Sequence, residues 1–568
     1  MQLVDAWRLF GPNLQTRGPA ALVEVAFEPG EDAEGAVRLW RQELLRIARE
    51  VGLPVPDAAA RVYRGGAVLT FSAAIDVLLP ATDAAEWAVE SAVSVLRGDG
   101  ALPLEPRRTT LRGAIAVSTN PRLVALEADA RERGLAFVWD EASVTVGAGR
   151  SKRAWPVTAL PAAEEVPWAA LESIPTALVT GTNGKTTSVR LLARLLSLAG
   201  RTVGMTTTDG VWIGEQCIES GDYTGPAGAT EVLGSTAIDA AVLETARGGI
   251  LRRGVIVRSP QVALITNVSD DHLGHYGIDT LEVLARVKGV VGSVVPPSGR
   301  VVVNADDPNV MAEARGFVAP LVLFSLDAKS PVIAAHVANG GEAWTVRDGW
   351  IMRLAALGET RLLEARELPI AFDGAAVYNV ANALGAAASA RALGVSDDTI
   401  IAGLRTFTSS AGDNPGRGNL STVGGVQVLV DFAHNPASIR SVLALVERLR
   451  AAGGRLAIVA GYAGDRSNDS IDDAAQAIFD ARPGRIVLRD LAGYLRGRAE
   501  GEVPRLFEEA LLRRGMAREV IDIAPSEGAA LRRALDWAQH GDFVLVLAHL
   551  ESTEVATVLE EAQRSSSR

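Results

Sequence analysis

The fold of this chain is decided by the stretch Thr176-Ala-Leu-Val-Thr-Gly-Thr-Asn-Gly-Lys-Thr186. Its first five residues are apolar or β-branched and predict a buried strand, and helical spacing follows from about 186 to 199. A glycine-containing loop between a strand and a helix lets consecutive backbone N–H groups face an anion, and the helix N-terminus adds its dipole. The stretch therefore predicts a phosphate-binding loop on an α/β sheet.

Two side chains of this loop carry specific expectations. Lys185 should reach the β- and γ-phosphates of a nucleotide, and the Thr186 hydroxyl should coordinate Mg²⁺. The strict Walker spacing needs a glycine where this chain has Val179, so the loop is a shorter variant. An ordinary glycine turn capped by threonine is the alternative, which the strand–loop–helix context disfavours. The predicted nucleotide contacts are Gly181, Thr182, Asn183, Gly184, Lys185, Thr186 and Thr187.

Polar residues also follow two other predicted strands, 240–243 and 262–266. In open α/β sheets, ligands bind beyond the carboxyl ends of the strands. Glu244 is therefore expected to complete a Mg²⁺ shell with Thr186 and phosphate oxygens, although such an acid can also be a solvated surface group. His272 suits either a metal ligand or a capping and packing role. Lys288, on a predicted helix, is by itself an ordinary helical lysine.

Further polar motifs occur near strand ends, helices and domain junctions. Taken singly, each is also compatible with a plain turn or helix cap. They are Asn304-Ala-Asp-Asp-Pro308, Tyr378-Asn-Val-Ala-Asn382, Pro415-Gly-Arg417, Val430-Asp-Phe-Ala-His-Asn-Pro436 and Gly461-Tyr-Ala-Gly-Asp-Arg466.

The chain divides by pattern into several parts. Residues 1–105 read as a small α+β domain, and residues 106–165 read as a short unit with a helix near 121–134. A linker with two prolines and two acids follows at 161–167, and a second break falls at 409–416. Strands and helices alternate after each break, as in parallel α/β sheets. The predicted strands are 21–27, 66–71, 176–180, 240–243, 262–266, 300–303, 426–430, 456–460, 485–488 and 543–547, and the other predicted helices are 36–52 and 84–96.

Size and charge limit the classes of function. At 568 residues the chain needs three or four domains. Its 48% hydrophobic and 22% charged residues are typical of a soluble globular protein. The net charge of −12 argues against nucleic acid as a main partner, because a phosphate backbone would be repelled. A local loop can still bind a nucleotide.

Cysteine content and hydropathy bear on where the protein works. The single cysteine, Cys217, excludes an internal disulfide and a multi-cysteine zinc site. Residues 1–8 do not read as a signal peptide, and no apolar run approaches the roughly 20 residues that span a bilayer. We therefore expect a cytoplasmic protein with no membrane partner, and we also expect a homo-oligomer.

Taken in order, the motifs resemble those of the Mur ligase superfamily, and most closely the Mur-like half of cyanophycin synthetase. The resemblance covers about residues 170–510 and rests on five runs. These are Val179-Thr-Gly-Thr-Asn-Gly-Lys-Thr-Thr187, Thr206-Thr-Thr-Asp-Gly210, Gly221-Asp-Tyr-Thr-Gly-Pro226, Leu243-Glu-Thr-Ala-Arg-Gly-Gly-Ile-Leu-Arg252 and Asp431-Phe-Ala-His-Asn-Pro436. It implies a three-domain Mur ligase architecture, with a central P-loop parallel sheet and a C-terminal Rossmann-like α/β domain, preceded by a small α+β domain.

The N-terminal part resembles the same enzyme at Leu9-Phe-Gly-Pro-Asn13. In cyanophycin synthetase an ATP-grasp domain lies between that domain and the Mur-like half, and this sequence has no room for it. The run 117–153 looks like a remnant of that domain. The implied domains are 1–165 with a truncated ATP-grasp lead-in, 166–410 as the central ATPase domain and 411–568 as the C-terminal domain. A single remaining ligase site argues against polymerisation of cyanophycin itself.

The resemblance also implies roles for individual residues. Thr186 and Glu244 would hold one Mg²⁺ with the ATP phosphates, and His272 would bind a second. Lys288 matches a lysine that is carbamylated in several Mur ligases and so supplies a carboxylate-like ligand. The implied ATP contacts are Asn382, Arg417 and, at the ribose, Asp431, with His434 or Asn435 near the nucleotide or the acceptor.

The expected reaction is ATP-dependent amide synthesis through an acyl phosphate. The substrates would be a peptide or aspartyl-like carboxylate and an amino acid, with a basic amino acid as one candidate amine. A separate ATP-grasp enzyme is a candidate partner. One alternative is a catalytically inactive nucleotide-binding scaffold or regulatory subunit that works with a separate ATP-grasp ligase. Such a subunit has no chemical reason to retain Lys185, Thr186, Glu244, His272 and Lys288 together. A glutamine-dependent amidating enzyme is disfavoured because Cys217 lies in no nucleophile motif.

Overall fold

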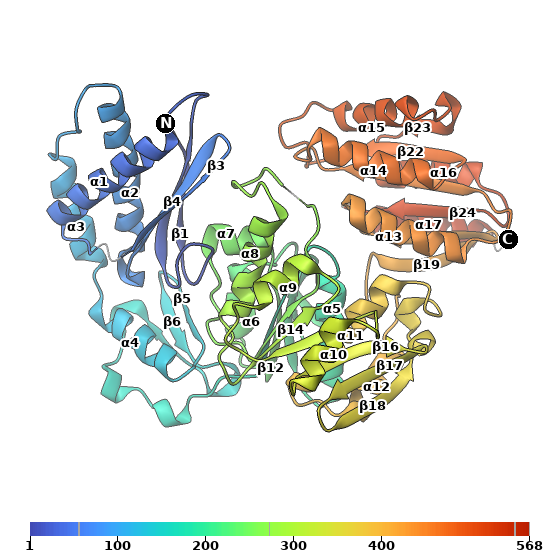
Figure 1. Cartoon of the computed structure of the whole chain (residues 1–568), viewed down its shortest axis with the longest axis horizontal. Helices are drawn as coiled ribbons and strands as arrows, with labels where there is room; N and C mark the ends of the chain where they lie inside the picture. Colours follow the sequence, from blue (N-terminus) through green and yellow to red (C-terminus); the bar gives the residue numbers. More distant parts are fainter. Residues whose placement is uncertain (55–56, 272, 550–551, 567–568) are drawn as a thin grey trace.

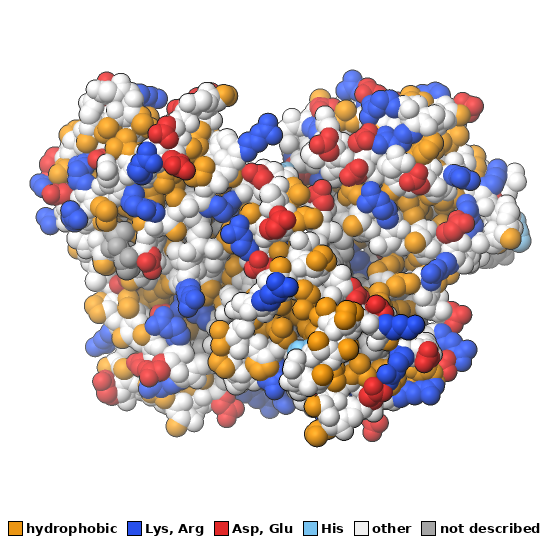
Figure 2. Space-filling view, in the orientation of Figure 1, with side chains coloured by type: hydrophobic (Ala, Val, Ile, Leu, Met, Phe, Trp, Pro, Cys, Tyr) orange, Lys and Arg blue, Asp and Glu red, His pale blue; other side chains and the backbone are white. Residues whose placement is uncertain are grey.

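The computed structural model describes residues 1–54, 57–271, 273–549 and 552–566. Four sheets follow one another along the chain (Figure 1), and the fold class is the one expected, a small α+β region followed by two α/β regions. Acidic and basic side chains are intermixed over the visible face rather than gathered into one charged patch (Figure 2). No helix in the described part of the chain is both long enough and apolar enough to cross a bilayer.

The N-terminal region begins with an antiparallel sheet in the order β1-β2-β4-β3; helices α1 and α2 pack on this sheet, and α3 packs against these two helices. Tryptophans 40 and 87 are fully buried between the sheet and these helices. The elements are β1 (Gln2–Leu9), β2 (Ala20–Ala26), β3 (Ala58–Tyr63), β4 (Gly66–Ser72), α1 (Ala33–Val51), α2 (Leu78–Leu96) and α3 (Arg107–Ser118). Helix α2 begins six residues before the predicted position 84, and it can include Pro80 because this proline lies in the first turn, where a missing N–H costs no hydrogen bond.

A smaller unit comes next along the chain, before the central sheet. It has one helix and an antiparallel sheet in the order β5-β6-β7. Its elements are α4 (Pro121–Glu132), β5 (Phe137–Trp139), β6 (Ser143–Val146) and β7 (Arg153–Pro156). The predicted helix near 121–134 is confirmed.

The central sheet has the order β11-β10-β9-β12-β8-β13-β14-β15-β16-β17-β18, with antiparallel hairpins at both ends of a parallel core. Strand β8 (Thr176–Thr180) lies between β12 (Ala240–Glu244) and β13 (Val262–Ile265). Successive strand residues alternate between the two faces. Ala177 and Val179 therefore join one core with α5, whereas Leu178 joins the other with α8.

The remaining elements of this region extend the same layers. The strands are β9 (Val203–Thr207), β10 (Gly210–Ile213), β11 (Gln216–Ser220), β14 (Arg300–Asn304), β15 (Leu321–Ser325), β16 (Glu342–Arg347), β17 (Trp350–Ala355) and β18 (Gly358–Glu364). The helices are α5 (Lys185–Leu198), α6 (Pro226–Leu233), α7 (Arg247–Arg253), α8 (Leu281–Ser293), α9 (Pro308–Ala314), α10 (Pro331–Ala338), α11 (Val377–Ala392) and α12 (Asp397–Thr406).

The C-terminal region is a second α/β layer structure with the strand order β19-β20-β24-β21-β22-β23. Its strands are parallel except for the β19–β20 pair. They are β19 (Arg417–Val423), β20 (Val426–Asp431), β21 (Leu456–Tyr462), β22 (Arg485–Asp490), β23 (Ile521–Ile523) and β24 (Phe543–Leu547). The helices are α13 (Pro436–Leu449), α14 (Asn468–Asp480), α15 (Glu502–Arg513), α16 (Glu527–Trp537) and α17 (Ser552–Ser566).

Candidate active site

The loop between β8 and α5 has the shape that its glycines predict. Gly184 precedes the helix with φ of 82°, and a Cβ on it would lie 2.1 Å from Oδ1 of Asn382. Gly181 has φ of 150°, and a Cβ there would lie 1.8 Å from Oγ1 of Thr266. A side chain at either position would have to push Asn382 or Thr266 aside, and its backbone would be held in a conformation that favours glycine.

The side chains of the loop meet the end of β12. The Thr186 hydroxyl donates a hydrogen bond of 2.8 Å to Oε2 of Glu244, which is 2% exposed. The second oxygen, Oε1, is buried and has no hydrogen-bond partner among the described residues. Burial raises the pKa of Glu244, although the nearby Lys185 ammonium opposes that rise. The pair thus offers a hydroxyl and a carboxylate oxygen at one point.

Lys288 approaches the same loop from α8. Its Nζ donates to the carbonyl of Gly181 at 2.7 Å, and the residue is 5% exposed. Burial, together with repulsion from Lys185, lowers the pKa of Lys288 well below its ordinary value. Low dielectric disfavours a charged amine, so the side chain is driven towards the neutral form.

A cleft of about 830 Å³ lies over this loop, between the central and C-terminal regions. Nearly all the site residues predicted from the sequence line this cleft. The predicted residues that line it are Thr182, Asn183, Gly184, Lys185, Thr186, Thr187, Glu244, Lys288, Asn382, Arg417, Asp431 and His434. Gly181 does not line the cleft but accepts the bond from Lys288. His272 lies outside the described residues.

The C-terminal region supplies the opposite wall. Arg417 donates a hydrogen bond of 3.1 Å to Thr208 and stacks 3.9 Å over the ring of Phe432. Asp431 accepts a hydrogen bond from the backbone N–H of Ala433 at 2.9 Å. Burial raises the pKa of Asp431 to about 6, although the positive charge of Arg417 acts to lower it.

Direct contacts join the two walls. Nδ2 of Asn435 donates to Oδ1 of Asn183 at 2.8 Å, and Nδ2 of Asn414 donates to the Thr187 hydroxyl at 3.3 Å. Asp271 forms an ion pair with Arg466. The phosphate-binding loop is thereby held against the C-terminal region on several sides.

Some of these residues had no role assigned from sequence. Thr208 lies 3.3 Å from Thr186, hydroxyl to hydroxyl, and its run 206–210 contributed only to the family resemblance. Asp271 and Arg466 are 195 positions apart, and nothing local to either predicts their ion pair. Asp465, which forms an ion pair with Arg496, also lines the cleft, and the sequence assigned no role to its loop.

Among the described residues, no three His, Cys, Asp or Glu side chains converge as metal ligands. The Thr186–Glu244 pair is therefore too small to hold a cation alone. A metal bound there would need further oxygens from a nucleotide, as Mg²⁺ in phosphate-transfer sites usually has.

Comparisons with known proteins identify the two α/β regions. The family model described as "Mur ligase middle domain" matches residues 179–390, and "Mur ligase, glutamate ligase domain" matches residues 416–550. Cyanophycin synthetase of Synechocystis sp. is 41% identical over 395 residues, covering 69% of this chain. The chain covers only 44% of that relative's length.

More distantly related proteins also match this chain. The UDP-N-acetylmuramoyl-L-alanyl-D-glutamate–2,6-diaminopimelate ligase of Chlamydia pneumoniae is 28% identical, covering 53% of this chain and 59% of that protein. Among solved structures, E. coli FolC with DHPP and ADP superposes with a TM-score of 0.51 at 21% identity, covering 68% of this chain and 89% of that one. The chain therefore belongs to the Mur ligase family of ATP-dependent acid–amino-acid ligases.

Proposed function

We propose that the chain joins a carboxylate to an amino-acid amine by way of an acyl phosphate, with release of ADP and phosphate. The observation that supports this most strongly is the convergence of Lys185, Thr186 and Glu244 beneath a cleft walled by two domains. The substrate carboxylate would attack the γ-phosphate of ATP, and the amine would then displace phosphate from the acyl carbon. We also propose that residues 1–165 form a domain that resembles the N-terminal domain of cyanophycin synthetase.

The residues present fit a magnesium ion. Thr186 and Glu244 offer hard oxygen donors, and Oε1 of Glu244 is buried with no partner among the described residues. A bound Mg²⁺ would neutralise phosphate charge during transfer. We propose that His272 and Lys288 serve a second ion, with Lys288 in a carbamylated form.

The protein's own side chains position the nucleotide and exclude water from the cleft. Lys185 begins α5 and would hold the negative charge of the transferred phosphoryl group. Arg417 and Asp431 lie across the cleft, where Asp431 can accept hydrogen bonds from ribose hydroxyls. The contacts from Asn183 to Asn435 and from Asp271 to Arg466 keep the two walls together, which protects an acyl phosphate from hydrolysis.

The proposed substrates follow from the relatives. An acidic peptide or aspartyl-like carboxylate and a basic amino acid are the first pair to test, because cyanophycin synthetase is the relative with 41% identity. A separate ATP-grasp enzyme is proposed as the source of the peptide.

Removal of carbon dioxide is expected to lower activity. A neutral, buried amine reacts with CO₂ to give a carbamate and a proton, and the pKa of Lys288 is lowered well below its ordinary value. Activity should fall at least tenfold in CO₂-depleted buffer and return with bicarbonate. The Lys288→Gln variant should show no such response. Equal rates of the unaltered protein with and without CO₂ would exclude carbamylation.

Nucleotide affinity is expected to depend on pH through Asp431. With its pKa raised to about 6, this carboxyl is charged at pH 7.5 and becomes protonated as the pH falls through 6. The protonated form has lost acceptor capacity, so the KM for ATP should rise several-fold between pH 7.5 and 5.5. In Asp431→Asn the KM should be raised at both pH values and the pH dependence abolished. A pH-dependent KM of unchanged size in this variant would assign the effect elsewhere.

Phosphate release against a panel of acids and amines tests the proposed function itself. We expect release that depends strictly on an acid and an amine together. The alternative, an inactive nucleotide-binding scaffold, predicts nucleotide binding without turnover for every pair. The lowered pKa of the buried Lys288 favours the ligase, because nucleotide binding alone does not need an amine that is poised for carbamylation.

A further inference from the structure

One loop of the central region, residues 273–279 between β13 and α8, contacts both the N-terminal and the C-terminal region. Arg61 of β3 donates to two consecutive carbonyls of this loop, and His275 of the loop contacts the C-terminal region. We propose that Arg61 is a positioning residue for the ligase reaction, and that through this loop the N-terminal sheet holds the C-terminal region closed over the nucleotide cleft. The proposal rests on the proposed function for the reaction that it serves.

The N-terminal sheet holds the loop by its backbone. Nη2 of Arg61 donates to the carbonyl of Tyr276 at 2.8 Å, and Nη1 donates to the carbonyl of Gly277. A Cβ on Gly277 would lie 2.2 Å from the ring of Tyr63, so this glycine lies directly against that ring. A guanidinium and an aromatic ring of β3 therefore fix the two carbonyls and the glycine in one place.

The loop is held in a conformation that its own residues disfavour. Tyr276 has φ of 54°, in the left-handed region where a bulky side chain is rare. Its ring lies 5.7 Å from the guanidinium groups of both Arg247 and Arg252 and packs edge-on at 6.1 Å from Trp7. Such a conformation persists only where the surroundings impose it. The two bonds from Arg61 are part of that constraint.

The side chains that contact the loop come from the face of the N-terminal sheet opposite α1 and α2. Trp7 and Tyr63 pack in a small apolar cluster, separate from the core that contains the two helices. Arg61 shares the face of Tyr63, because residues two apart on a strand point the same way. This face of the sheet is therefore the one that packs against the central region.

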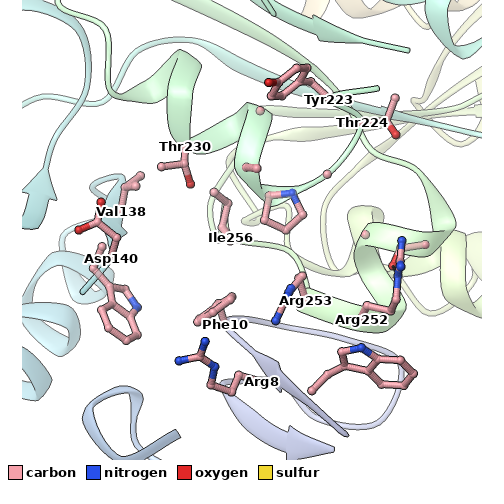
Figure 3. Close-up of a pocket in the computed structure, with 18 of the residues that line it drawn as sticks. Arg8, Phe10, Val138, Asp140, Tyr223, Thr224, Thr230, Arg252, Arg253 and Ile256 are labelled. Carbon is pink, nitrogen blue, oxygen red and sulfur yellow. Dashed lines mark hydrogen bonds between the residues drawn. The ribbon is translucent and has the colours of Figure 1, made fainter. Parts of the chain in front are cut away.

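The N-terminal sheet is itself anchored to the central region. Phe10 donates its N–H to the carbonyl of Arg253 at 2.7 Å, and Val255 donates to the carbonyl of Pro12 at 2.8 Å. Figure 3 shows Phe10 close to Arg253 where the end of β1 meets α7, beside a cavity of about 930 Å³. Because β1 and β3 belong to one sheet, these bonds also fix the place from which Arg61 reaches the loop.

The other side of the loop meets the C-terminal region. Nε2 of His275 lies 2.8 Å from the carbonyl oxygen of Asp465, and this oxygen can only accept, so Nε2 is the donor. Asp271, just before the loop, forms an ion pair with Arg466, and its Oδ2 lies 3.8 Å from Nε2 of His434. Asp465 and His434 both line the nucleotide cleft. The loop thus links the N-terminal sheet to the far wall of that cleft.

This link has a chemical consequence for the proposed reaction. An acyl phosphate that meets water gives back the free acid and phosphate, so ATP is consumed and no amide forms. A cleft that stays closed until the amine attacks prevents this loss. The N-terminal sheet therefore acts on the yield of amide per ATP without contacting the nucleotide.

The ratio of phosphate released to amide formed tests the proposal in the full chain. The unaltered chain should release one phosphate for each amide. Arg61→Gln should slow amide synthesis by about tenfold or more and raise the ratio to about two or above, because water then competes with the amine. Arg61→Lys, whose ammonium can still donate to a loop carbonyl, should lose less. A variant that was merely poorly folded would lose phosphate release and amide in equal proportion.

Arg64→Gln is the matched control. Arg64 is exposed, lies just after β3, and donates its backbone N–H to Asp279 at 3.3 Å, a bond that a change of side chain leaves in place. Its rate and its ratio should equal those of the unaltered chain.

Amide hydrogen exchange measures the same link with no substrate present. Arg61→Gln should speed exchange at 273–279, which Arg61 contacts, and also at 463–467 in the C-terminal region. Gly277→Ala is a second variant that acts from the loop side, because its methyl group would push against the ring of Tyr63. It should give the same exchange pattern and the same rise in the phosphate ratio.

Equal amounts of phosphate and amide in Arg61→Gln would overturn the proposal. Unchanged exchange at 463–467, or an equal loss in Arg64→Gln, would also overturn it. The exchange experiment needs no turnover, so it separates this inference from the proposed function. Faster exchange in a chain that makes no amide with any substrate pair would remove the function and keep the link between the regions. A coupled ligase that Arg61→Gln leaves unaltered would keep the function and remove the link.

Discussion

Replacing Lys185 by alanine is expected to reduce ATP-dependent amide synthesis by about a thousandfold or more. The ammonium is the protein's cation at the phosphate-binding loop, and it is held there by a 3.0 Å bond to the Thr182 carbonyl. Its charge matters most when negative charge spreads over the phosphoryl oxygens in the transition state. A thousandfold loss corresponds to about 4 kcal/mol of transition-state stabilisation.

The measurement is phosphate release coupled to product formation, with Lys329→Ala as the control. Lys329 is an exposed lysine on the same domain and lies outside the nucleotide cleft. The control should keep full activity, and both variants should unfold at nearly the temperature of the unaltered protein. Amide synthesis at an undiminished rate in Lys185→Ala would mean that the loop does not take part in the reaction.

Replacing Glu244 by glutamine is expected to cost about a hundredfold to a thousandfold in kcat/KM and to raise the Mg²⁺ concentration needed for half-maximal rate. The amide keeps an oxygen that can accept the Thr186 hydrogen bond, but it carries no charge for a cation. Burial raises the pKa of Glu244, so ionising this carboxyl costs more free energy in the folded chain than in the unfolded chain. Without nucleotide or metal, the variant should therefore be at least as stable as the unaltered chain.

This combination of lower activity and undiminished stability separates a metal ligand from a structural acid. A magnesium titration of the rate and a thermal unfolding curve measure the two effects. Glu313→Gln is the matched control, because burial also raises the pKa of that carboxyl but it lies on α9, away from the cleft. An unchanged magnesium dependence in Glu244→Gln would show that this acid binds no metal.

The parallel core was predictable because its strands are buried on both faces. Strands such as β8 and β13 therefore read as unbroken apolar or β-branched runs. β1 escaped prediction because it is an edge strand whose residues are mostly exposed or half-buried. The hairpin strand β11 is fully exposed and likewise leaves little pattern.

The candidate active site likewise has residues whose meeting could be predicted from the sequence and contacts that could not. Lys185 and Thr186 begin the helix that follows β8, and Glu244 ends β12, so their meeting is implied by the parallel pairing of these two strands. The contact between Asn183 and Asn435 joins residues 252 positions apart, and only the packing of two domains creates it.

The central claim is that ATP activates a carboxylate as an acyl phosphate. It is tested most directly with an acid substrate labelled with ¹⁸O in its carboxylate, using the acid and amine that support turnover. Attack of the labelled oxygen on the γ-phosphate predicts one ¹⁸O atom in the released phosphate for each amide formed. Phosphate that carries no label while amide accumulates would contradict the account.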